Sequence, residues 1–317
     1  KVFQNRTQIK NKVGSNFSGN IVLPLVFIAV MLIGALISPL FFSVQNLRNI
    51  IIGSATFGIL ASGMTVILIA GEIDLSVGSQ VALTSVVMAT LAPRSLTLAI
   101  FVSILVTVSI GIVNGVLLTK TKMPSFVLTL STMGIVRSIA LVIGDGQPVY
   151  GVPRSYANLA NASVGGIPLV ALALVVIYLL TWFFLKYTTL GRSIYSVGSN
   201  AEAARLTGIN VNRIKVAAYA ISGFMAGLAG LYYTSYVTLG LPDGAVDYET
   251  EAITAAIIGG ASFFGGEGQV TNTLLGFLIV AIVKNILNLM GVSPFVQPVA
   301  IGLLIIVAVG VRTMRKS

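Results

Sequence analysis

Long apolar runs alternate with short polar segments over most of the chain. A helix needs about 20 mainly apolar residues to cross a bilayer. Ten runs approach or reach that length: Ile21–Phe41, Ile50–Ala70, Val77–Leu91, Leu96–Leu118, Phe126–Ile143, Pro168–Phe184, Val216–Tyr236, Ala252–Phe264, Thr273–Met290 and Phe295–Val311. The pattern predicts an all-α integral membrane protein with ten transmembrane helices in one domain, residues 21–311, between an N-terminal segment 1–20 and a tail 312–317.

Two of these runs, Val77–Leu91 and Ala252–Phe264, are too short for a straight crossing. Broken or short helices are tolerated inside a bundle, where irregular backbone is buried in protein. Each run adjoins a glycine-rich acidic loop, Gly71–Ser79 or Gly265–Gln269. The likeness of the two loops hints at a duplicated half, and internal repeats with broken helices are common in transporters.

The composition supports a membrane protein and excludes several kinds of site. The chain is 56% hydrophobic and 9% charged, with a mean hydropathy of +0.98, whereas a soluble domain carries about 25% charged residues. It has no cysteine and no histidine, which excludes disulfides, Cys/His zinc sites and histidine-based catalysis. No phosphate-binding G-x-x-x-x-G-K-[ST] loop occurs, so ATP-driven transport needs hydrolysis by another chain. We therefore expect no catalytic residue, metal site or cofactor here, with ATP and magnesium bound by a partner.

The net charge of +10 would suit a nucleic-acid partner, but lysine and arginine in a membrane protein mark cytoplasmic loops. With ten crossings and the N-terminus inside, fourteen basic residues fall in the cytoplasm and three outside. This distribution predicts that both termini are cytoplasmic, that lipid is the surrounding partner, and that nucleic acid is not one. The basic segment before Ile21 resembles a signal peptide, yet the run after it is too long, so we expect an uncleaved first span.

A polar interruption between the sixth and seventh runs contains a well-marked short helix. Ala201–Leu206 are mostly good helix formers. Ser199 and Glu202 have capping-box spacing, and Gly208 is suited to end the helix. A helix this short is marginal alone and needs something to pack against. The charge count places this loop, residues 188–213, in the cytoplasm; an ordinary loop helix is the alternative to a partner-binding one.

Acidic side chains near membrane depth are costly and are functional candidates by default. Glu72 and Asp74 lie in the loop before the third run, followed by Ser76, Ser79 and Gln80. One interpretation is direct contact with substrate or a gating role. The other is capping, because a carboxylate accepts hydrogen bonds from free N–H groups where a helix begins.

Other polar residues fall within or at the ends of the runs. Asn285 and Asn288 share a helix face, next to Lys284, and either line a polar pathway or bond between helices. Arg137 lies within reach of the outer interface or an internal acid. An aromatic belt is the expected role, and sugar stacking the alternative, for Tyr232, Tyr233 and Tyr236.

The outer loop Thr238–Glu251 holds a group of acids that are candidates for docking a basic partner surface. They are Asp243, Asp247, Glu249 and Glu251. Complementary charge steers association, and the alternative is solvated loop charge. Glycines with small-xxx-small spacing, Gly223, Gly227 and Gly230, predict close helix packing in the seventh run.

Three stretches carry a resemblance to a known family. They are Gly63–Ser79 (GMTVILIAGEIDLSVGS), Gly191–Asn210 (GRSIYSVGSNAEAARLTGIN) and Ala255–Gly268 (AAIIGGASFFGGEG). In kind and order they resemble the signatures of bacterial sugar ABC-importer permeases of the ribose/galactose/xylose type, from about residue 20 to the C-terminus. The chain departs from the commonest pattern at Glu72 and Ser199, where glycine is usual.

The resemblance implies a fold similar to the vitamin B12 importer's membrane subunit (type II), with ten helices, in the bacterial inner membrane. It also implies a homodimer, a periplasmic or lipid-anchored sugar-binding protein and two cytoplasmic ABC ATPase domains. The family's coupling helix falls on Ser199, Asn200, Ala201, Glu202, Ala203, Ala204, Arg205, Leu206, Thr207 and Gly208. Translocation-path candidates are Glu72, Asp74, Ser76, Ser79, Asn285 and Asn288.

These observations predict the permease subunit of a binding-protein-dependent ABC importer that moves a simple sugar, a pentose or hexose, by alternating access. Two other functions stay open. One is a sister permease for branched-chain amino acids or a signalling furanose, which only substrate assays separate. The other is an ion-coupled secondary transporter, which would work without an ATPase and would place a coupling carboxylate in mid-bundle.

Overall fold

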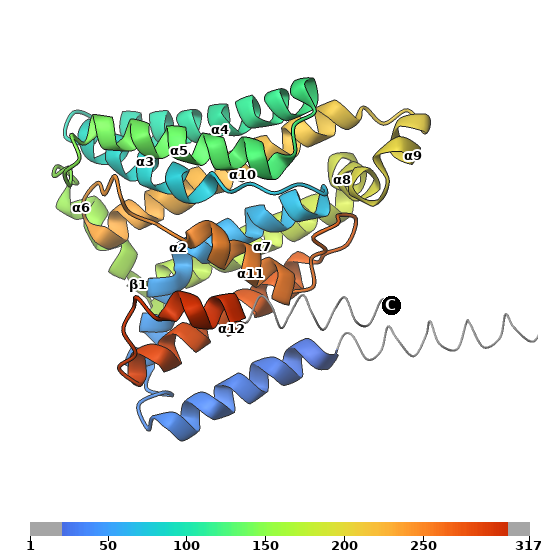
Figure 1. Cartoon of the computed structure of the whole chain (residues 1–317). Helices are drawn as coiled ribbons and strands as arrows, with labels where there is room; N and C mark the ends of the chain where they lie inside the picture. Colours follow the sequence, from blue (N-terminus) through green and yellow to red (C-terminus); the bar gives the residue numbers. More distant parts are fainter. Residues whose placement is uncertain (1–20, 304–317) are drawn as a thin grey trace, which may run out of the picture.

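Helices make up nearly all regular structure in residues 21–303, the part of the chain that this computed structural model describes (Figure 1). The predictions for residues 1–20 and 312–317, and for the end of the last span, lie outside the described residues. The longer helices are Ile21–Ile37, α2 (Val44–Ile69), α3 (Val77–Leu91), α4 (Leu96–Thr121), α5 (Ser125–Ile143), α7 (Leu169–Tyr187), α10 (Val211–Val237), α11 (Tyr248–Ile258) and α12 (Val270–Leu289), and a further helix begins at residue 297.

Short elements fill two of the connections. Between α5 and α7 lie α6 (Arg154–Ala157), the 3-10 helix η1 (Asn158–Asn161) and an antiparallel hairpin of β1 (Ser163–Val164) and β2 (Ile167–Pro168). Between α7 and α10 lie α8 (Thr189–Ser199) and α9 (Ala201–Leu206). The sequence predicted neither the hairpin nor α8.

Six of the described helices, α2, α4, α5, α7, α10 and α12, are long and apolar enough to cross a membrane. This confirms the prediction of an all-α membrane protein with several spans. The count of ten crossings and the placement of both termini in the cytoplasm stay predictions.

The core is built on α2, which runs through the middle of the bundle (Figure 1). Its residues from Ser54 to Ile69 are all buried, as expected for a helix that is apolar on all sides. The two short helices, α3 and α11, are also buried, which confirms that short helices lie inside the bundle. Helix α11 ends at Ile258, well before the predicted Phe264, because Gly259 and Gly260 follow it and Gly260 adopts a left-handed φ of +91°.

Close approach of α10 to α4 depends on glycine. A Cβ added at Gly223 would lie 2.2 Å from the carbonyl oxygen of Thr107, and one at Gly111 would lie 2.2 Å from that of Tyr219. The prediction of small-residue packing in the seventh run is confirmed. Helix α10 starts earlier than predicted, at Val211, because the side chain of Asn210 accepts a hydrogen bond from the Arg213 N–H and caps the helix there.

Candidate functional site

Helix α9 spans Ala201–Leu206, as predicted, but its cap differs from the prediction. Asn200, and not Ser199, is the N-cap: its side-chain oxygen accepts from the Ala203 N–H at 2.9 Å. Ser199 is the last residue of α8, so the predicted capping box was wrong. Glu202 is instead ion-paired with Arg205 on the surface of the same helix, at 3.2 Å. Gly208 takes the predicted left-handed conformation, with φ +86°.

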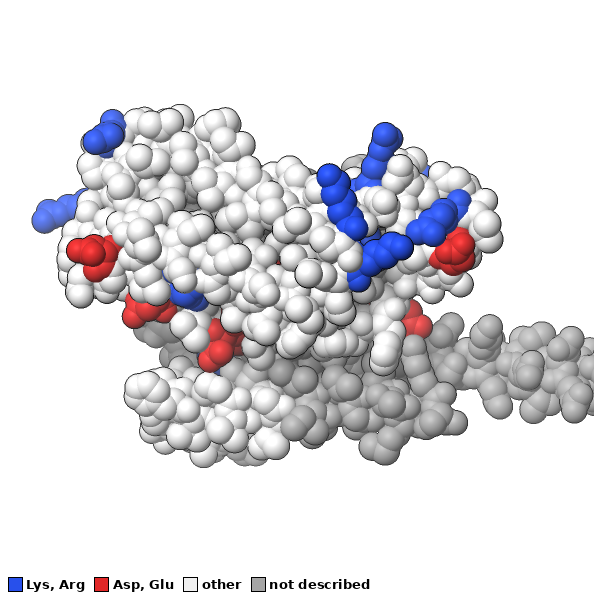
Figure 2. Space-filling view, turned by 45° about the horizontal axis from the view of Figure 1, so that its top comes forward, with Lys and Arg blue, Asp and Glu red and all other residues white. Residues whose placement is uncertain are grey.

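The predicted coupling residues stand at the outer surface of one end of the bundle, here called the α9 end. Of these ten residues, Ala204 is buried, Ala201 is half-buried and the other eight are exposed. Leu206 is 82% exposed, although it is apolar. Lysine and arginine side chains gather at this end (Figure 2), as the positive-inside rule predicts for a cytoplasmic surface.

Helix α8 fixes α9 to the core. Thr188 caps α8 by accepting from the Gly191 N–H at 3.0 Å, and its buried face includes Ile194 and Val197. At its far end, a Cβ on Gly198 would lie 1.8 Å from the carbonyl oxygen of Ile69. No other residue type fits there, so α8 packs directly against the end of α2.

The three stretches that carry the family resemblance meet at this point. Gly71 lies beside both Gly198 and Gly265, because a Cβ added to it would be 3.7 Å and 3.8 Å from their Cα atoms. The Gly266 N–H donates to the Ile69 carbonyl at 2.9 Å. We call this contact of residues 69–71, 198–199 and 265–266 the glycine junction. It joins the two acidic glycine-rich loops, which are far apart in sequence, to the helix that precedes α9.

Asp74 is fully buried and its hydrogen bonds are all within the protein. It accepts from the Ser76 N–H at 3.0 Å, from the Ser76 hydroxyl, and from the Ser222 hydroxyl of α10 at 2.8 Å. The Ser76 oxygen accepts in turn from Gln80 at 2.9 Å and from Asn114 of α4 at 3.2 Å. This geometry favours the capping interpretation over substrate contact in this conformation.

The same network extends to α5, because Thr132 donates to the Asn114 side-chain oxygen at 2.7 Å. Ser79, another predicted path residue, donates to the Ser76 carbonyl at 2.8 Å and is buried. Sequence reasoning missed Asn114 and Ser222. The signal that would have found Asn114 is an amide in mid-span between Gly111 and Gly115, where a polar group needs an interhelical partner.

Glu72 forms an ion pair with Lys215, in the second turn of α10. Its side chain is 9% exposed and that of Lys215 is 25% exposed. Both line a cavity of about 500 Å³ that is also lined by Ala201 and Arg205 of α9 and by Lys122. The negative charge of Glu72, where the family usually has glycine, is thus neutralised by Lys215. The ion pair also links the loop after α2 to the start of α10.

Asn285 and Asn288 each bond to a different neighbour. Asn285 exchanges two hydrogen bonds with Asn46 of α2, at 2.8 Å and 3.0 Å. Asn288 accepts from Gln297 at 2.7 Å. Of the two interpretations that the sequence left open, the structure therefore favours bonds between helices.

The four acids predicted to lie in an outer loop do not form one exposed group. Asp243 and Asp247 are exposed and Glu249 is half-buried, but Glu251 is only 6% exposed. Glu251 pairs with Lys284 of α12 at 2.6 Å, a partner that the sequence did not suggest. Glu249 lies in the first turn of α11, outside the membrane-length helices, where burial raises its pKa to about 7.

Arg137 and the outer tyrosines hold this end of the bundle together. Arg137 donates to the carbonyls of Pro242 and Gly244, at 3.0 Å and 2.6 Å, so it secures the outer loop. Tyr233 is 6% exposed, and the Tyr232 hydroxyl donates to the Ile52 carbonyl at 2.7 Å. For Tyr233, which is buried, the structure favours packing inside the protein over the expected aromatic belt; Tyr232 is half-buried, and its place in a belt stays a prediction.

Several membrane-length helices with a polar network inside the bundle are the architecture expected of a multi-pass membrane permease. Within residues 21–303, no group of three or more acidic side chains is arranged to hold a metal ion. Residues 46–309 match the family model described as the permease component of the branched-chain amino acid transport system. The chain belongs to this permease family.

Curated relatives cover nearly the whole chain. The ribose import permease protein of Haemophilus influenzae is 40% identical over 89% of this chain and 90% of its own length. That of Bacillus subtilis is 37% identical over 90% and 89%, and the D-allose transport system permease of Escherichia coli K12 is 36% identical over 89% and 87%. No solved structure matches the chain. The predicted resemblance to sugar ABC permeases, and the prediction of a multi-pass protein of the bacterial inner membrane, are confirmed.

Proposed function

We propose that this chain is the membrane-spanning subunit of an ABC importer that moves a simple sugar, a pentose or hexose, into the cell. The observation that carries the proposal is its similarity over about nine-tenths of its length to permeases named for ribose, allose and arabinose. In this proposal the chain crosses the membrane ten times with both termini in the cytoplasm. A separate ATPase binds ATP and magnesium, and a second copy of the chain completes the pathway.

Helix α9 is the proposed contact with the ATPase. It is short, capped at Asn200, and attached to the bundle at both ends. On one side α8 bears on the end of α2 through Gly198 at the glycine junction. On the other side α10 follows directly, and its Lys215 is paired with Glu72. A force applied to α9 is therefore delivered to α2 and α10, which pack against each other at the centre of the bundle.

Alternating access follows if the two ATPases approach each other on binding nucleotide and each displaces an α9. Inside the bundle, the buried network around Asp74 joins α3, α4, α5 and α10 and moves with them as a unit. In this proposal the binding protein, and not the permease, selects the sugar, as the resemblance to binding-protein-dependent importers implies. The proposed surface of this chain that docks the binding protein consists of Asp243, Asp247 and Glu249. Glu251 is left out, because it is buried and paired with Lys284.

The test replaces Leu206 by Glu, which puts a charge at a large apolar residue of α9 that is 82% exposed. The expected result is loss of copurification with the ATPase and loss of sugar-stimulated ATP hydrolysis in liposomes. Val164→Glu is the matched control, because Val164 is also an exposed apolar residue, 62% exposed, but lies in the β1–β2 hairpin, outside both α9 and the proposed docking surface. Unchanged assembly and uptake in the Leu206→Glu protein would refute the coupling role.

Substrate class is tested separately. Uptake of labelled ribose, allose and arabinose is compared with that of leucine, since the family description includes branched-chain amino acid permeases. Sugar uptake that requires the ATPase supports the proposal. Leucine uptake would point to the sister permease, and uptake without any ATPase would point to a secondary transporter.

A further inference from the structure

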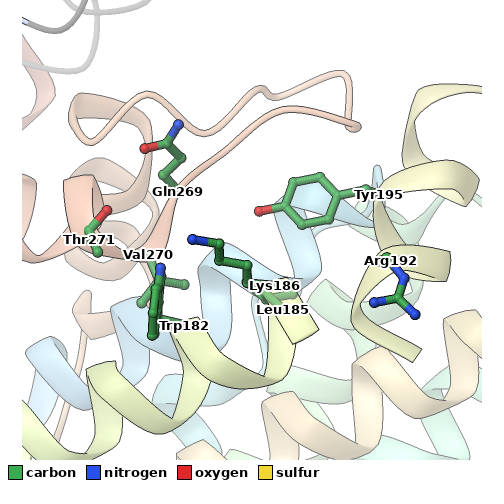
Figure 3. Close-up of a pocket in the computed structure, with 8 residues that line it drawn as sticks. All are labelled: Trp182, Leu185, Lys186, Arg192, Tyr195, Gln269, Val270 and Thr271. Atoms are coloured by element: carbon green, nitrogen blue, oxygen red, sulfur yellow. The ribbon is translucent and has the colours of Figure 1, made fainter. Parts of the chain in front are cut away.

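A pocket of about 480 Å³ lies between the end of α7, α8 and the start of α12. Figure 3 shows the residues that line it, which are Trp182, Leu185, Lys186, Arg192, Tyr195, Gln269, Val270 and Thr271. Two are cationic, three carry a hydroxyl or amide, and none is acidic. The lining residues do not overlap with the coupling or translocation residues discussed above.

The polar groups of the pocket favour an anion. Lys186 and Gln269 both line the pocket, the Lys186 side chain extends toward Trp182 (Figure 3), and ammonium and amide groups can both donate hydrogen bonds. Lys186 has no ion pair with a carboxylate among residues 21–303. Its ammonium lies 4.9 Å from the centroid of the Trp182 ring, which orients it without neutralising its charge. Arg192, whose guanidinium donates to the Tyr187 carbonyl at 3.2 Å, adds a second positive charge at the rim.

The pocket lies at the end of an apolar, exposed surface of α7. Val176, Leu179, Leu180 and Phe183 are each more than half exposed and lead toward Lys186 along this helix. In a membrane-length helix such a surface faces acyl chains. Tryptophan and lysine at the end of a span are typical of the headgroup region. The positive pocket and the apolar surface therefore meet at the boundary between headgroups and acyl chains.

We propose that this pocket binds the phosphate-bearing headgroup of an anionic phospholipid, whose acyl chains lie along α7. An acidic side chain of a partner protein would satisfy Lys186 but would leave the adjoining apolar surface of α7 unused, whereas a lipid uses both. Tyr195 donates to the Gly268 carbonyl at 2.8 Å, so the pocket wall is shared by α8 and the segment before α12. A bound headgroup thus ties α7, α8 and α12 together at the base of α9. The inference does not depend on the transported substrate.

The chain supplies its own probe, because Trp182 is its single tryptophan. The full chain is reconstituted in vesicles of phosphatidylcholine and phosphatidylglycerol in which either lipid, in turn, carries brominated acyl chains that quench tryptophan. If the pocket selects the anionic lipid, brominated phosphatidylglycerol quenches Trp182 more than brominated phosphatidylcholine at equal mole fraction. About 1 kcal/mol per basic residue near an anionic surface corresponds to a preference of about fivefold or more.

Lys186→Gln is the test variant and Lys120→Gln the matched control, since Lys120 is an exposed lysine at the end of span α4, away from the pocket. The ratio of the two quenching curves is taken within each variant, so any change in Trp182 emission cancels. The proposal predicts a preference that Lys186→Gln abolishes, and that Lys186→Arg and Lys120→Gln keep. Equal quenching by both lipids, or a preference unchanged in Lys186→Gln, would overturn it. Loss of the preference on adding millimolar inorganic phosphate would also overturn it, because the pocket would then be a site for soluble phosphate.

Discussion

The ion pair between Glu251 and Lys284 gives the sharpest prediction about stability. Their nitrogen and oxygen lie 2.6 Å apart, and the side chains are 7% and 25% exposed. The second carboxylate oxygen of Glu251 is buried without a hydrogen-bond partner. The Lys284 ammonium also lies 5.4 Å and 5.8 Å from the ring centroids of Phe57 and Tyr248. Replacing Lys284 by Met keeps an unbranched side chain that is one atom shorter and removes the charge that neutralises Glu251.

The magnitude follows from the geometry. At 2.6 Å the direct attraction is about 6 kcal/mol for an effective dielectric constant of about 20, most of which is offset by desolvation of the two ions. Removing one partner of a buried pair leaves an uncompensated charge and costs about 3–5 kcal/mol. Because Lys284 is one-quarter exposed, we expect the lower end, about 3 kcal/mol. Adding Glu251→Gln to the Lys284→Met variant removes the unpaired charge and should restore about 1–2 kcal/mol of the free energy of unfolding.

The assay is reversible unfolding of the purified protein in mixed micelles, followed by circular dichroism, for both single variants and the double variant. Lys120→Met is the control, because Lys120 is exposed and should change stability by less than about 0.5 kcal/mol. The reasoning fails if Lys284→Met costs less than about 1 kcal/mol, or if the effects of the two substitutions simply add.

Two further predictions concern packing and pH. Gly223→Ala should destabilise the bundle by about 1–3 kcal/mol, because the added Cβ would lie 2.2 Å from the Thr107 carbonyl oxygen. Gly134→Ala is the control and should be neutral or stabilising, because no atom lies within 4 Å of its added Cβ. Equal unfolding midpoints for the two variants would contradict the packing argument. Burial raises the pKa of Glu249 from its ordinary 4.5 to about 7, so the folded protein holds a proton that the unfolded chain releases. This contribution to stability is complete below about pH 4.5 and is lost as the pH rises through about 7, so Glu249→Gln, but not Asp243→Asn at an exposed position, should flatten the fall in stability over that range. A fall that is as steep in Glu249→Gln as in the parent chain would refute the assignment.

The positions of the helices were largely predictable, because a bilayer requires long apolar runs and these are visible in the sequence. The helix ends were less so. Side chains such as Ser43 and Asn210 cap α2 and α10 several residues before the apolar runs begin. Helix α8 was missed because its composition is rich in Ser, Thr and Gly, which are weak helix formers. It forms because Ile194 and Val197 are buried against the bundle, which no local pattern reveals.

The candidate site, too, was predictable from the sequence only in part. The sequence by itself determined that α9 is a short helix over Ala201–Leu206, that it lies in a basic loop, and that the chain resembles sugar permeases. Only the tertiary structure decided the partners of the acidic residues: Glu72 with Lys215, Asp74 with Ser222, and Glu251 with Lys284. These pairs join residues far apart in the chain, and a charge or hydroxyl has no preferred partner until packing brings one within reach. The glycine junction is another such case. A glycine in the sequence indicates that another backbone can pack closely against it, but it does not indicate which segment does so.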